Sequence, residues 1–468
     1  MPRLDARKTL LMTSTFRLGR HCGLDGREEL GQLELPSHHL LTHGVIVGMT
    51  GSGKTGLTMV MVEEALRARV PVLMIDVKGD LPNLALAFPT FDAAAMRPWV
   101  EPAPDDDDGI ADDPVIAEAL EKRRAGLAEA QIGEAELLAY TQRTYVRVVT
   151  PGCDSGESLH LLSALERRSP RWDNDIAGAR STLGAAITMV LRLIGRDGEP
   201  GRSREHALLS VLAEARLMRG ESAELGALMP EILDPPMAEV GALPIDAFMS
   251  PRQRADLAAD VNTLIAAPTF AAWRVGQDLD VARWMEPIDG KTPATIISVA
   301  HLDDDERAMV LGVILEEVLA WVRCQQGTTR LRALIAFDEV YGFIPPHPAN
   351  PPTKRPMVAL MKQARAYGVG VLLATQNPMD LDYRTLSNAG LWMLGRLQTD
   401  ADRARVMEGL GEDKKRSDLA NIVKKLGPRW FVVRDSKTNK LSLLNPRWAM
   451  SYLKGPMTKS EIKRVRAA

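Results

Sequence analysis

The segment 45–66, VIVGMTGSGKTGLTMVMVEEAL, constrains the fold of this chain more than any other. Four residues separate Gly48 from Gly53, and Lys54 and Thr55 follow directly, which is the spacing of a phosphate-binding loop. The apolar run 44–47 predicts a buried strand before the loop, and apolar residues at helical spacing predict a helix after it. The motif therefore has the strand–loop–helix context that it requires.

The residue types of this loop suit a polyphosphate. Glycines let the backbone adopt conformations closed to other residues, so successive N–H groups can surround an anion at the start of a helix. We expect the Lys54 ammonium to reach the β- and γ-phosphates and the Thr55 hydroxyl to bind Mg²⁺, which makes ATP and Mg²⁺ the expected cofactors. The predicted nucleotide-binding residues are Gly48, Thr50, Gly51, Ser52, Gly53, Lys54, Thr55 and Gly56.

The composition is that of a globular protein, with 45% hydrophobic and 25% charged residues in 468. The sequence has no unbroken apolar run long enough to cross a membrane, so we expect no membrane insertion. The three cysteines are isolated and odd in number. They indicate neither a disulfide framework nor a metal site, and they suit a reducing, cytoplasmic location.

The net charge of −3 does not by itself indicate a nucleic-acid-binding protein. The charge is unevenly distributed, however. Residues 101–118 are acidic, whereas residues 411–468 contain 15 Lys and Arg against 5 Asp and Glu. This basic end could contact nucleic acid or an acidic partner, or it could be a solvated surface.

Strands and helices alternate along the chain, which predicts an α/β fold with a doubly wound, mostly parallel sheet. The stretch 116–141 is rich in Ala, Glu, Leu and Arg and predicts a helix, and 429–444 predicts a hairpin with its turn near 436–439. The expected domains are the first part of the ATPase core (1–90), a mostly helical insertion with an acidic loop near 101–118 (91–290), the second part of the core (291–450) and a basic C-terminal tail (451–468).

Two further strands end in residues that complete a hydrolytic site. The run 333–337 is apolar and is followed by Asp338 and Glu339. We expect Asp338 to hold the Mg²⁺ shell and Glu339 to polarise the attacking water as general base. The strand in GVGVLLATQNP ends near Gln376, which either lies beside the γ-phosphate and reports its hydrolysis or caps the local backbone.

Other polar residues leave alternatives open. Asp76 follows the apolar run 72–75, at the strand end where α/β sheets bind ligands, or it belongs to a plain turn. Phosphoryl transfer also benefits from an arginine supplied across a subunit interface. Each candidate is otherwise a surface arginine; they are Arg365, Arg396, and Arg403 or Arg405.

With these parts in place, the chain resembles the HerA branch of the HerA/FtsK superfamily of P-loop ATPases. The resemblance rests on THGVIVGMTGSGKT, VLMIDVKGDL, LIAFDE and KQARAYGVGVLLATQNPMDLDYRTLSNAGLWMLGRLQTDADRARV. It implies a RecA-like motor with an extra strand between the phosphate-loop strand and the Asp-Glu strand. Matching positions carry over the roles of Lys54, Thr55, Asp338, Glu339 and Gln376, and Arg365 lies where the family has its trans-acting arginine helix.

The resemblance implies a hexameric ring that pulls double-stranded DNA through a channel, often beside a nuclease or other effector, in DNA repair or phage defence. The leading hypothesis is therefore an ATP-hydrolysing DNA translocase or helicase. One alternative is a soluble transport ATPase of the conjugation and secretion type. Another is a nucleotide-gated platform that recruits an effector and uses hydrolysis for regulation.

Overall fold

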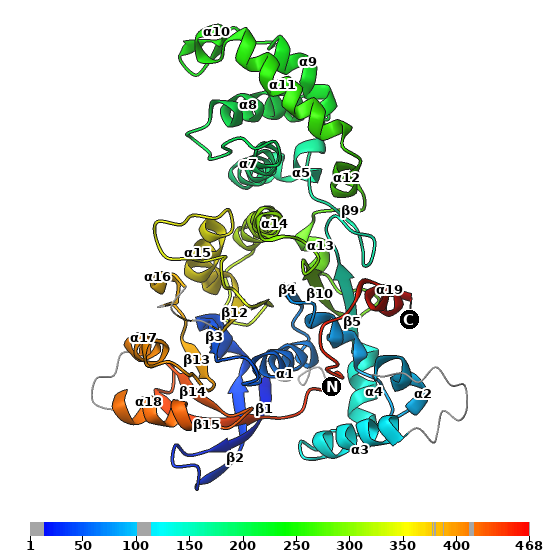
Figure 1. Cartoon of the computed structure of the whole chain (residues 1–468), viewed down its shortest axis with the longest axis vertical. Helices are drawn as coiled ribbons and strands as arrows, with labels where there is room; N and C mark the ends of the chain where they lie inside the picture. Colours follow the sequence, from blue (N-terminus) through cyan, green and yellow to red (C-terminus); the bar gives the residue numbers. More distant parts are fainter. Residues whose placement is uncertain are drawn as a thin grey trace, which may run out of the picture.

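The computed structural model describes residues 14–100, 114–376, 378, 381–386, 388–410 and 416–467. Eleven strands of this part of the chain form one sheet in the order β2-β1-β15-β14-β13-β3-β12-β11-β4-β10-β5 (Figure 1). Helices cover both faces of the sheet. The predicted α/β, doubly wound, mostly parallel architecture is confirmed.

The parallel part of the sheet contains the phosphate-loop strand and its neighbours. Its strands are β3 (Gly44–Val47), β4 (Val72–Asp76), β5 (Thr144–Val149), β10 (Thr292–Ser298), β11 (Ala333–Asp338), β12 (Val369–Thr375) and β13 (Leu391–Leu394). Strand β12 lies between β3 and β11, as the resemblance implied. Thr375 pairs with Val47, and Phe337 pairs with Leu373, so these strands end at the same edge.

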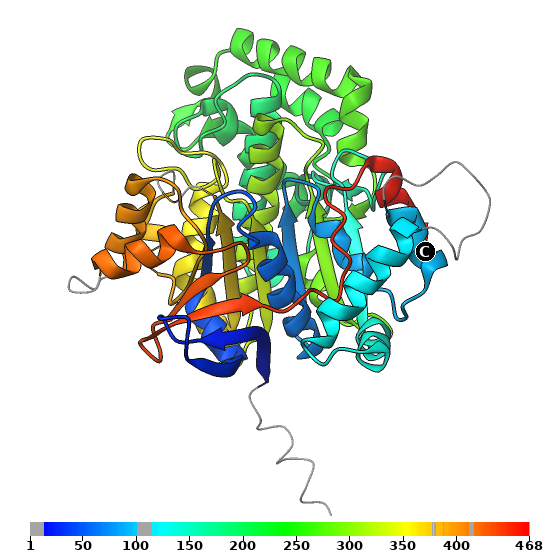
Figure 2. The ribbon, with the colours of Figure 1, turned by 60° about the horizontal axis from the view of Figure 1, so that its bottom comes forward.

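An antiparallel part extends the sheet beyond β13. It consists of β1 (Thr15–Cys22), β2 (Glu29–Pro36), β14 (Phe431–Asp435) and β15 (Lys440–Pro446). Strands β14 and β15 are the predicted hairpin. Figure 2 shows this part along the lower side, with the chain after β15 passing α1 (Lys54–Arg67) toward α19 (Lys459–Ala467).

Alternating side chains of the parallel strands fill two cores. Ile46 and Met74 point to the face covered by α1, whereas Val45 and Leu73 point to the face covered by α14 (Asp304–Arg323). Strands that are buried on both faces lack polar positions, which explains the continuous apolar runs in the sequence. The two cores hold β3 and α1 rigidly around the loop that joins them.

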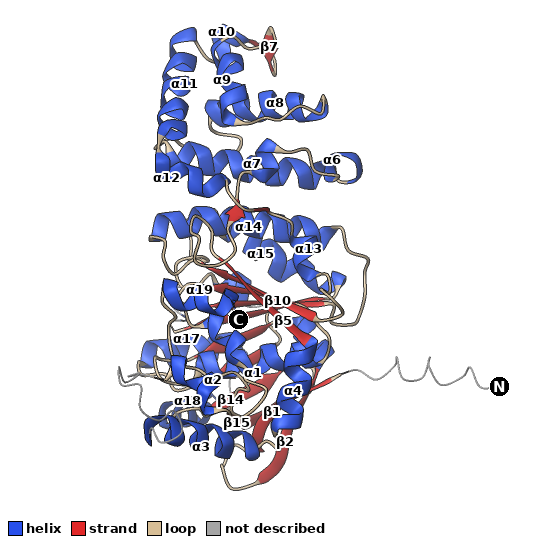
Figure 3. Ribbon diagram, turned by 90° about the vertical axis from the view of Figure 1, so that its right-hand side faces the viewer, coloured by secondary structure: helices blue, strands red, loops and turns tan. Residues whose placement is uncertain are grey.

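A helical region lies beyond α14 on the side away from the sheet (Figure 3). Helix α7 packs on α14. Among the described helices, α7 alone is long and apolar enough to span a membrane, and half of its apolar window is buried within the protein. The region contains α5 (Ser163–Glu166), α6 (Arg171–Asn174), α7 (Ile176–Leu193), α8 (Arg204–Met218), α9 (Leu225–Leu233), α10 (Ile245–Phe248), α11 (Pro251–Ala266), α12 (Pro268–Ala271) and η5 (Ala272–Arg274), with short strands β6 (Leu159–His160), β7 (Glu239–Val240), β8 (Leu243–Pro244) and β9 (Gln277–Asp278). Helix α13 (Val281–Met285) follows this region and packs on β10 and β4 of the sheet.

The remaining elements flank the sheet. They are η2 (Ser37–Thr42), η3 (Leu81–Leu86), α2 (Ala93–Met96), η4 (Arg97–Trp99), α3 (Pro114–Ala128), α4 (Glu134–Arg143), α15 (Lys354–Gln363), η6 (Ala364–Tyr367), α16 (Tyr383–Leu386), α17 (Asp400–Leu410) and α18 (Arg416–Lys425). The stretch 116–141 thus forms two helices, because Gln131 takes a left-handed backbone (φ 57°) and Gly133 is extended.

Three of the expected segments can be compared with the structure: the insertion, the acidic loop and the basic tail. Residues 91–290 supply β5 to the sheet as well as the helical region. Most of the acidic loop, residues 101–113, lies outside the described residues. In the basic tail, α19 contacts the rest of the chain, since Lys463 pairs with Asp154 at 2.9 Å and the Arg464 guanidinium donates to the Pro98 carbonyl at 2.9 Å.

Candidate active site

The phosphate loop runs from the end of β3 to the first residue of α1. Gly51 and Gly53 have φ values of 75° and 95°, which side chains with a Cβ rarely adopt, so the sequence needs glycine at both positions. Neighbouring strands fix the loop at its start. The Gly48 N–H donates to the Thr375 carbonyl at 3.2 Å, and the Met49 N–H donates to the Arg396 carbonyl at 2.9 Å.

Lys54 is folded onto its own loop. Its ammonium donates to the Gly48 carbonyl at 2.7 Å and to the Met49 carbonyl at 3.1 Å. Only 7% of the residue is exposed, and this burial lowers the pKa of Lys54 to about 8. A bound polyphosphate would supply the anionic partner that this buried cation lacks on the loop.

Asp338 ends β11 with a carboxylate suited to a cation. The residue is 2% exposed, and its Oδ2 has no hydrogen-bond partner in the part of the chain that the structure describes. Burial raises the pKa of Asp338 to about 6. A buried, unpaired carboxylate oxygen is costly, and Mg²⁺ would remove that cost.

The Asp338 carboxylate and the Thr55 hydroxyl fit the coordination that Mg²⁺ prefers in proteins. The described residues contain no group of three or more His, Cys, Asp or Glu that could cage a metal ion. Mg²⁺ usually binds through one or two carboxylates together with waters and substrate phosphates. Asp338 and Thr55 would therefore hold it jointly with the nucleotide.

Glu339 follows with a left-handed backbone, φ 66°, which redirects its side chain at the end of the strand. Its Oε1 accepts from the Gln376 N–H at 3.2 Å and from the Thr375 hydroxyl at 3.3 Å. Its Oε2 lies 2.9 Å from the ammonium of Lys78. The predicted general base is thus held between the ends of β12 and β4.

Gln376 links this carboxylate to the loop. Its Oε1 accepts from the Thr50 hydroxyl at 2.7 Å, while its backbone N–H contacts Glu339. Residues predicted from separate motifs, Thr50, Glu339 and Gln376, therefore meet at one edge of the sheet. They meet there because the three parallel strands end at the same level.

Asp76 holds a turn. It is fully buried; its Oδ1 accepts from the Gly79 N–H at 2.9 Å and its Oδ2 from the Ser298 hydroxyl at 2.8 Å. Burial raises the pKa of Asp76 to about 6. Of the two interpretations of Asp76, these contacts favour the turn. The turn carries Lys78, so Asp76 shapes the site indirectly.

The candidate arginines lie in different parts of the fold. Arg396 is exposed beside the loop, with its Nε 3.3 Å from the Met49 sulfur. Arg365 is exposed in η6, before the amino end of β12, at the opposite edge of the sheet. Arg403 is buried and donates to the Leu397 and Gln398 carbonyls, each at 2.8 Å, which gives it a structural role. Arg405 lies on α17.

Two site residues had no role assigned from the sequence. Lys78 was visible in VLMIDVKGDL, but its pairing with Glu339 depends on β4 and β11 being neighbours. Arg429 lies against the loop: its N–H donates to the Ser52 carbonyl at 3.0 Å, and a Cβ on Gly53 would lie 3.1 Å from its Cγ. No spacing in the sequence indicates this contact, because Arg429 comes from the turn before β14.

Comparisons with known proteins concern the phosphate-loop region and the fold. The family model "Helicase HerA-like C-terminal" matches residues 25–117. None of the curated proteins matches the chain. Among solved structures, VirB4 of Thermoanaerobacter pseudethanolicus is similar over 93% of this chain and 97% of its own, with 12% identity and a TM-score of 0.53, a likeness in fold.

Two further structures are more distant. The plasmid coupling protein TrwB in complex with ADP and Mg²⁺ covers 91% of each chain at 11% identity, with a TM-score of 0.49. The genome packaging NTPase B204 of Sulfolobus turreted icosahedral virus 2 covers 33% of this chain and 69% of its own at 15% identity, with a TM-score of 0.25. At these scores neither adds to the argument. The family match over residues 25–117, the phosphate loop and the fold shared with VirB4 together make this chain similar to the P-loop ATPases of the HerA/FtsK type.

Proposed function

We propose that this protein hydrolyses ATP to ADP and phosphate to drive double-stranded DNA through a ring of its own subunits. The observation that carries the proposal is the contact of Glu339 with Gln376, which in turn contacts Thr50 on the phosphate loop. An acidic residue, a polar sensor and the loop are thereby joined, which is the arrangement that hydrolysis requires. Glu339 and Gln376 are therefore the proposed catalytic pair.

Each residue has a defined task in this scheme. Lys54 would exchange the Gly48 and Met49 carbonyls for the β- and γ-phosphates, while Asp338 and Thr55 would hold Mg²⁺. Mg²⁺ supplies charge neutralisation at the phosphates when bound. Glu339 takes a proton from the attacking water, and Gln376 lies beside the γ-phosphate.

The motor part of the proposal draws on the family. The matching model describes a helicase, which supports DNA as the partner that moves. A hexameric ring, a cytoplasmic location, and a nuclease or other effector as co-worker complete the proposal. Arg365 and Arg396 are the proposed arginines of the ring, and the helical insertion is proposed as a separate domain.

ATP turnover with and without double-stranded DNA tests the function. We expect DNA to stimulate turnover, Lys54→Ala to abolish it, and the protein to reach the mass of a hexamer when ATP and DNA are present. A pure protein whose turnover ignores DNA would contradict the translocase. Turnover that depends on a membrane fraction would instead select the transport ATPase.

The assembly platform differs in what hydrolysis accomplishes. If a nuclease co-purifies with the protein and its activity persists with Glu339→Gln, binding of ATP alone suffices and the platform is selected. If effector activity falls together with turnover in Glu339→Gln, the motor is supported. The same variant thus separates the two functions.

A further inference from the structure

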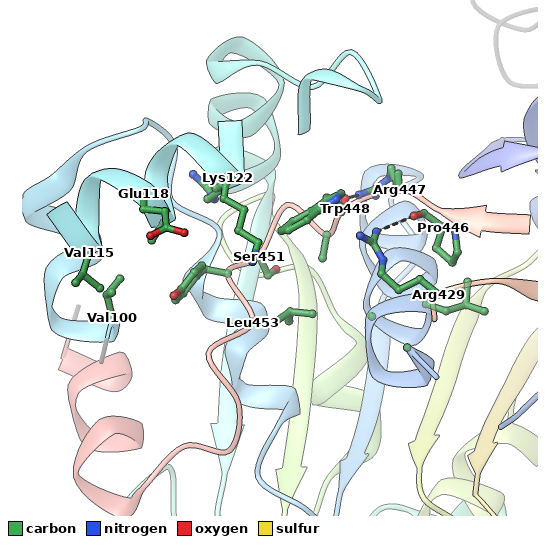
Figure 4. A pocket seen from close by; sticks show the side chains of 17 residues that line it. Val100, Val115, Glu118, Lys122, Arg429, Pro446, Arg447, Trp448, Ser451 and Leu453 are labelled. Atoms are coloured by element: carbon green, nitrogen blue, oxygen red, sulfur yellow. Dashed lines mark hydrogen bonds between the residues drawn. The ribbon is translucent and has the colours of Figure 1, made fainter. Parts of the chain in front are cut away.

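A cavity opens beside the phosphate loop (Figure 4). It measures about 580 Å³, within the usual range for small-molecule sites. Most of its walls come from the start of α1, one side of α3 and the segment 446–453 after β15, and Val100 and Arg429 complete the lining. Of these parts, only the start of α1 belongs to the phosphate-binding loop region.

The cavity is continuous with the phosphate loop. Gly53, Gly56 and Leu57 line it directly. A Cβ placed on Gly56 would meet no atom within 4 Å, so the backbone of the first helical turn faces open space. A nucleotide whose phosphates occupy the loop therefore has room to extend its sugar and base into this cavity.

The lining suits a flat, mostly apolar ring. Tyr452 is half-buried in the wall, and Val115 and Leu453 are apolar residues that are 43% and 40% exposed. Glu118 and Lys122 stand one helical turn apart on α3 and add an acceptor and a donor at the rim. A base offers both an apolar face for stacking and polar edges for such groups.

The walls are held in place before any ligand binds. The Arg429 guanidinium donates to the Pro446 carbonyl at 2.9 Å, and its Cζ lies 5.0 Å from the centre of the Trp448 ring. Helix α3 fits closely against this ring, since a Cβ on Gly126 would lie 2.4 Å from Trp448 Cδ2. A pocket formed in advance loses little free energy in ordering when it binds.

We propose that this cavity receives the ribose and base of the ATP whose phosphates bind the loop, with Tyr452 and the Val115–Lys122 side of α3 as its recognition surfaces. The proposal rests on the proposed function, because it requires a nucleotide on the loop. It assigns to α3, which precedes β5 and lies outside the strands of the site, a direct part in nucleotide affinity.

Two substitutions on α3 test this. Ala119 lines the cavity, so Ala119→Trp fills it; Ala117 is exposed on the same helix but does not line the cavity, so Ala117→Trp is the matched control. Steady-state turnover gives KM for ATP, and competition gives the inhibition constant of inorganic tripolyphosphate, which has no base. We expect Ala119→Trp to raise KM by about tenfold or more, the scale of one lost stacking contact, and to leave tripolyphosphate inhibition unchanged.

A second variant removes a wall instead of filling the space. Tyr452→Ala should raise KM for ATP in the same selective way, and thermal melting checks that both variants fold. The proposal is overturned if KM for ATP stays at its wild-type value in both variants, or if KM and the tripolyphosphate constant rise together. Lys54→Ala distinguishes failure of the proposed function from failure of the base site. If Lys54→Ala hydrolyses ATP as fast as the wild type, the proposed function fails. If Lys54→Ala loses turnover while the cavity variants keep the wild-type KM, only the base site is ruled out.

Discussion

The ion pair between Lys78 and Glu339 joins the ends of two neighbouring strands, β4 and β11. Lys78 is one-third exposed at its side chain, whereas Glu339 is 13% exposed, so the carboxylate lies inside and the ammonium covers it. The pair limits the positions that the carboxylate can adopt. A general base must lie within hydrogen-bond reach of the water that it activates.

Replacing Lys78 should therefore change kcat more than KM. In Lys78→Met the Glu339 carboxylate loses one of its fixed contacts, and we expect kcat to fall by about tenfold, less than the loss of a general base. Lys78→Arg should restore most of the rate because it keeps the charge. Steady-state ATP kinetics check this; a rise in KM at constant kcat would instead assign Lys78 to substrate binding.

The buried ammonium of Lys54 gives a pH-dependent prediction. Burial lowers the pKa of Lys54 from 10.5 to about 8, so this residue favours folding above pH 10.5, and that contribution is lost as the pH falls through about 8. Phosphates stabilise the charged form. At pH 9 the free protein has largely lost this proton, and ATP binding must take it up.

Calorimetry in buffers with different ionisation enthalpies measures this uptake. We expect close to one proton per ATP at pH 9 and little from Lys54 at pH 6.5, where the ammonium is already charged. Equal proton uptake at the two pH values would contradict the assignment. Lys54→Arg is the control, since arginine stays charged throughout.

At the scale of elements, a buried ionic cluster ties the chain after β15 to α1. The guanidinium of Arg447 lies 2.9 Å from Glu63 and 2.9 Å from Glu64, and all three side chains are at most 4% exposed. Glu63 also accepts from the Met450 and Ser451 N–H groups. The segment that walls the cavity beside the loop is thus fixed to the phosphate-loop helix.

Breaking this cluster should destabilise the protein strongly. In Arg447→Ala two carboxylates remain buried without their cation, and the free energy of unfolding should drop by about 3–5 kcal/mol. The exposed pair of Lys463 and Asp154 is the comparison, where Lys463→Ala should cost about 1 kcal/mol or less. Urea denaturation measures both; similar losses would show that the buried cluster contributes little.

The elements also show what the sequence predicts and what it does not. The hairpin of β14 and β15 and the meeting of Glu339 and Gln376 with the loop were predictable, because strand ends and turn residues are local signals. The break at Gln131 was not, since a left-handed glutamine in a helix-forming stretch has no strong local signature. The pairing of Lys78 and the contact of Arg429 depend on strand order and on a distant turn. The catalytic and binding roles of these residues are still predictions.

For the whole molecule, the two arginine candidates lie at opposite edges of the sheet. Arg396 lies beside the loop of its own subunit, whereas Arg365 is far from it in the same chain and would need a neighbour's site. This placement follows from the sequence, because Arg365 precedes a strand whose other end carries Gln376. In the proposed ring, the two ends of the parallel strands would therefore present different surfaces to the neighbouring subunits.

Mixing inactive subunits distinguishes the two arginines. If Arg365 acts across an interface, mixing Arg365→Ala with Lys54→Ala should recover ATP turnover, because some sites combine an intact Lys54 with an intact Arg365 from the other chain. Arg396→Ala mixed with Lys54→Ala should recover turnover only if Arg396 also acts across the interface, and no recovery would assign Arg396 to the loop of its own subunit. Recovery in neither mixture would remove Arg365 from the trans role.

Strand β12 has a mechanical consequence. It is buried along its whole length, carries Gln376 just past one end, and follows the exposed Arg365 at the other. Seven extended residues span roughly 20 Å, and a hydrogen-bonded strand resists stretching. If Gln376 contacts the γ-phosphate in the proposed ring, loss of that phosphate would displace β12 as a unit, and each protomer would pass its nucleotide state to the next through this one strand.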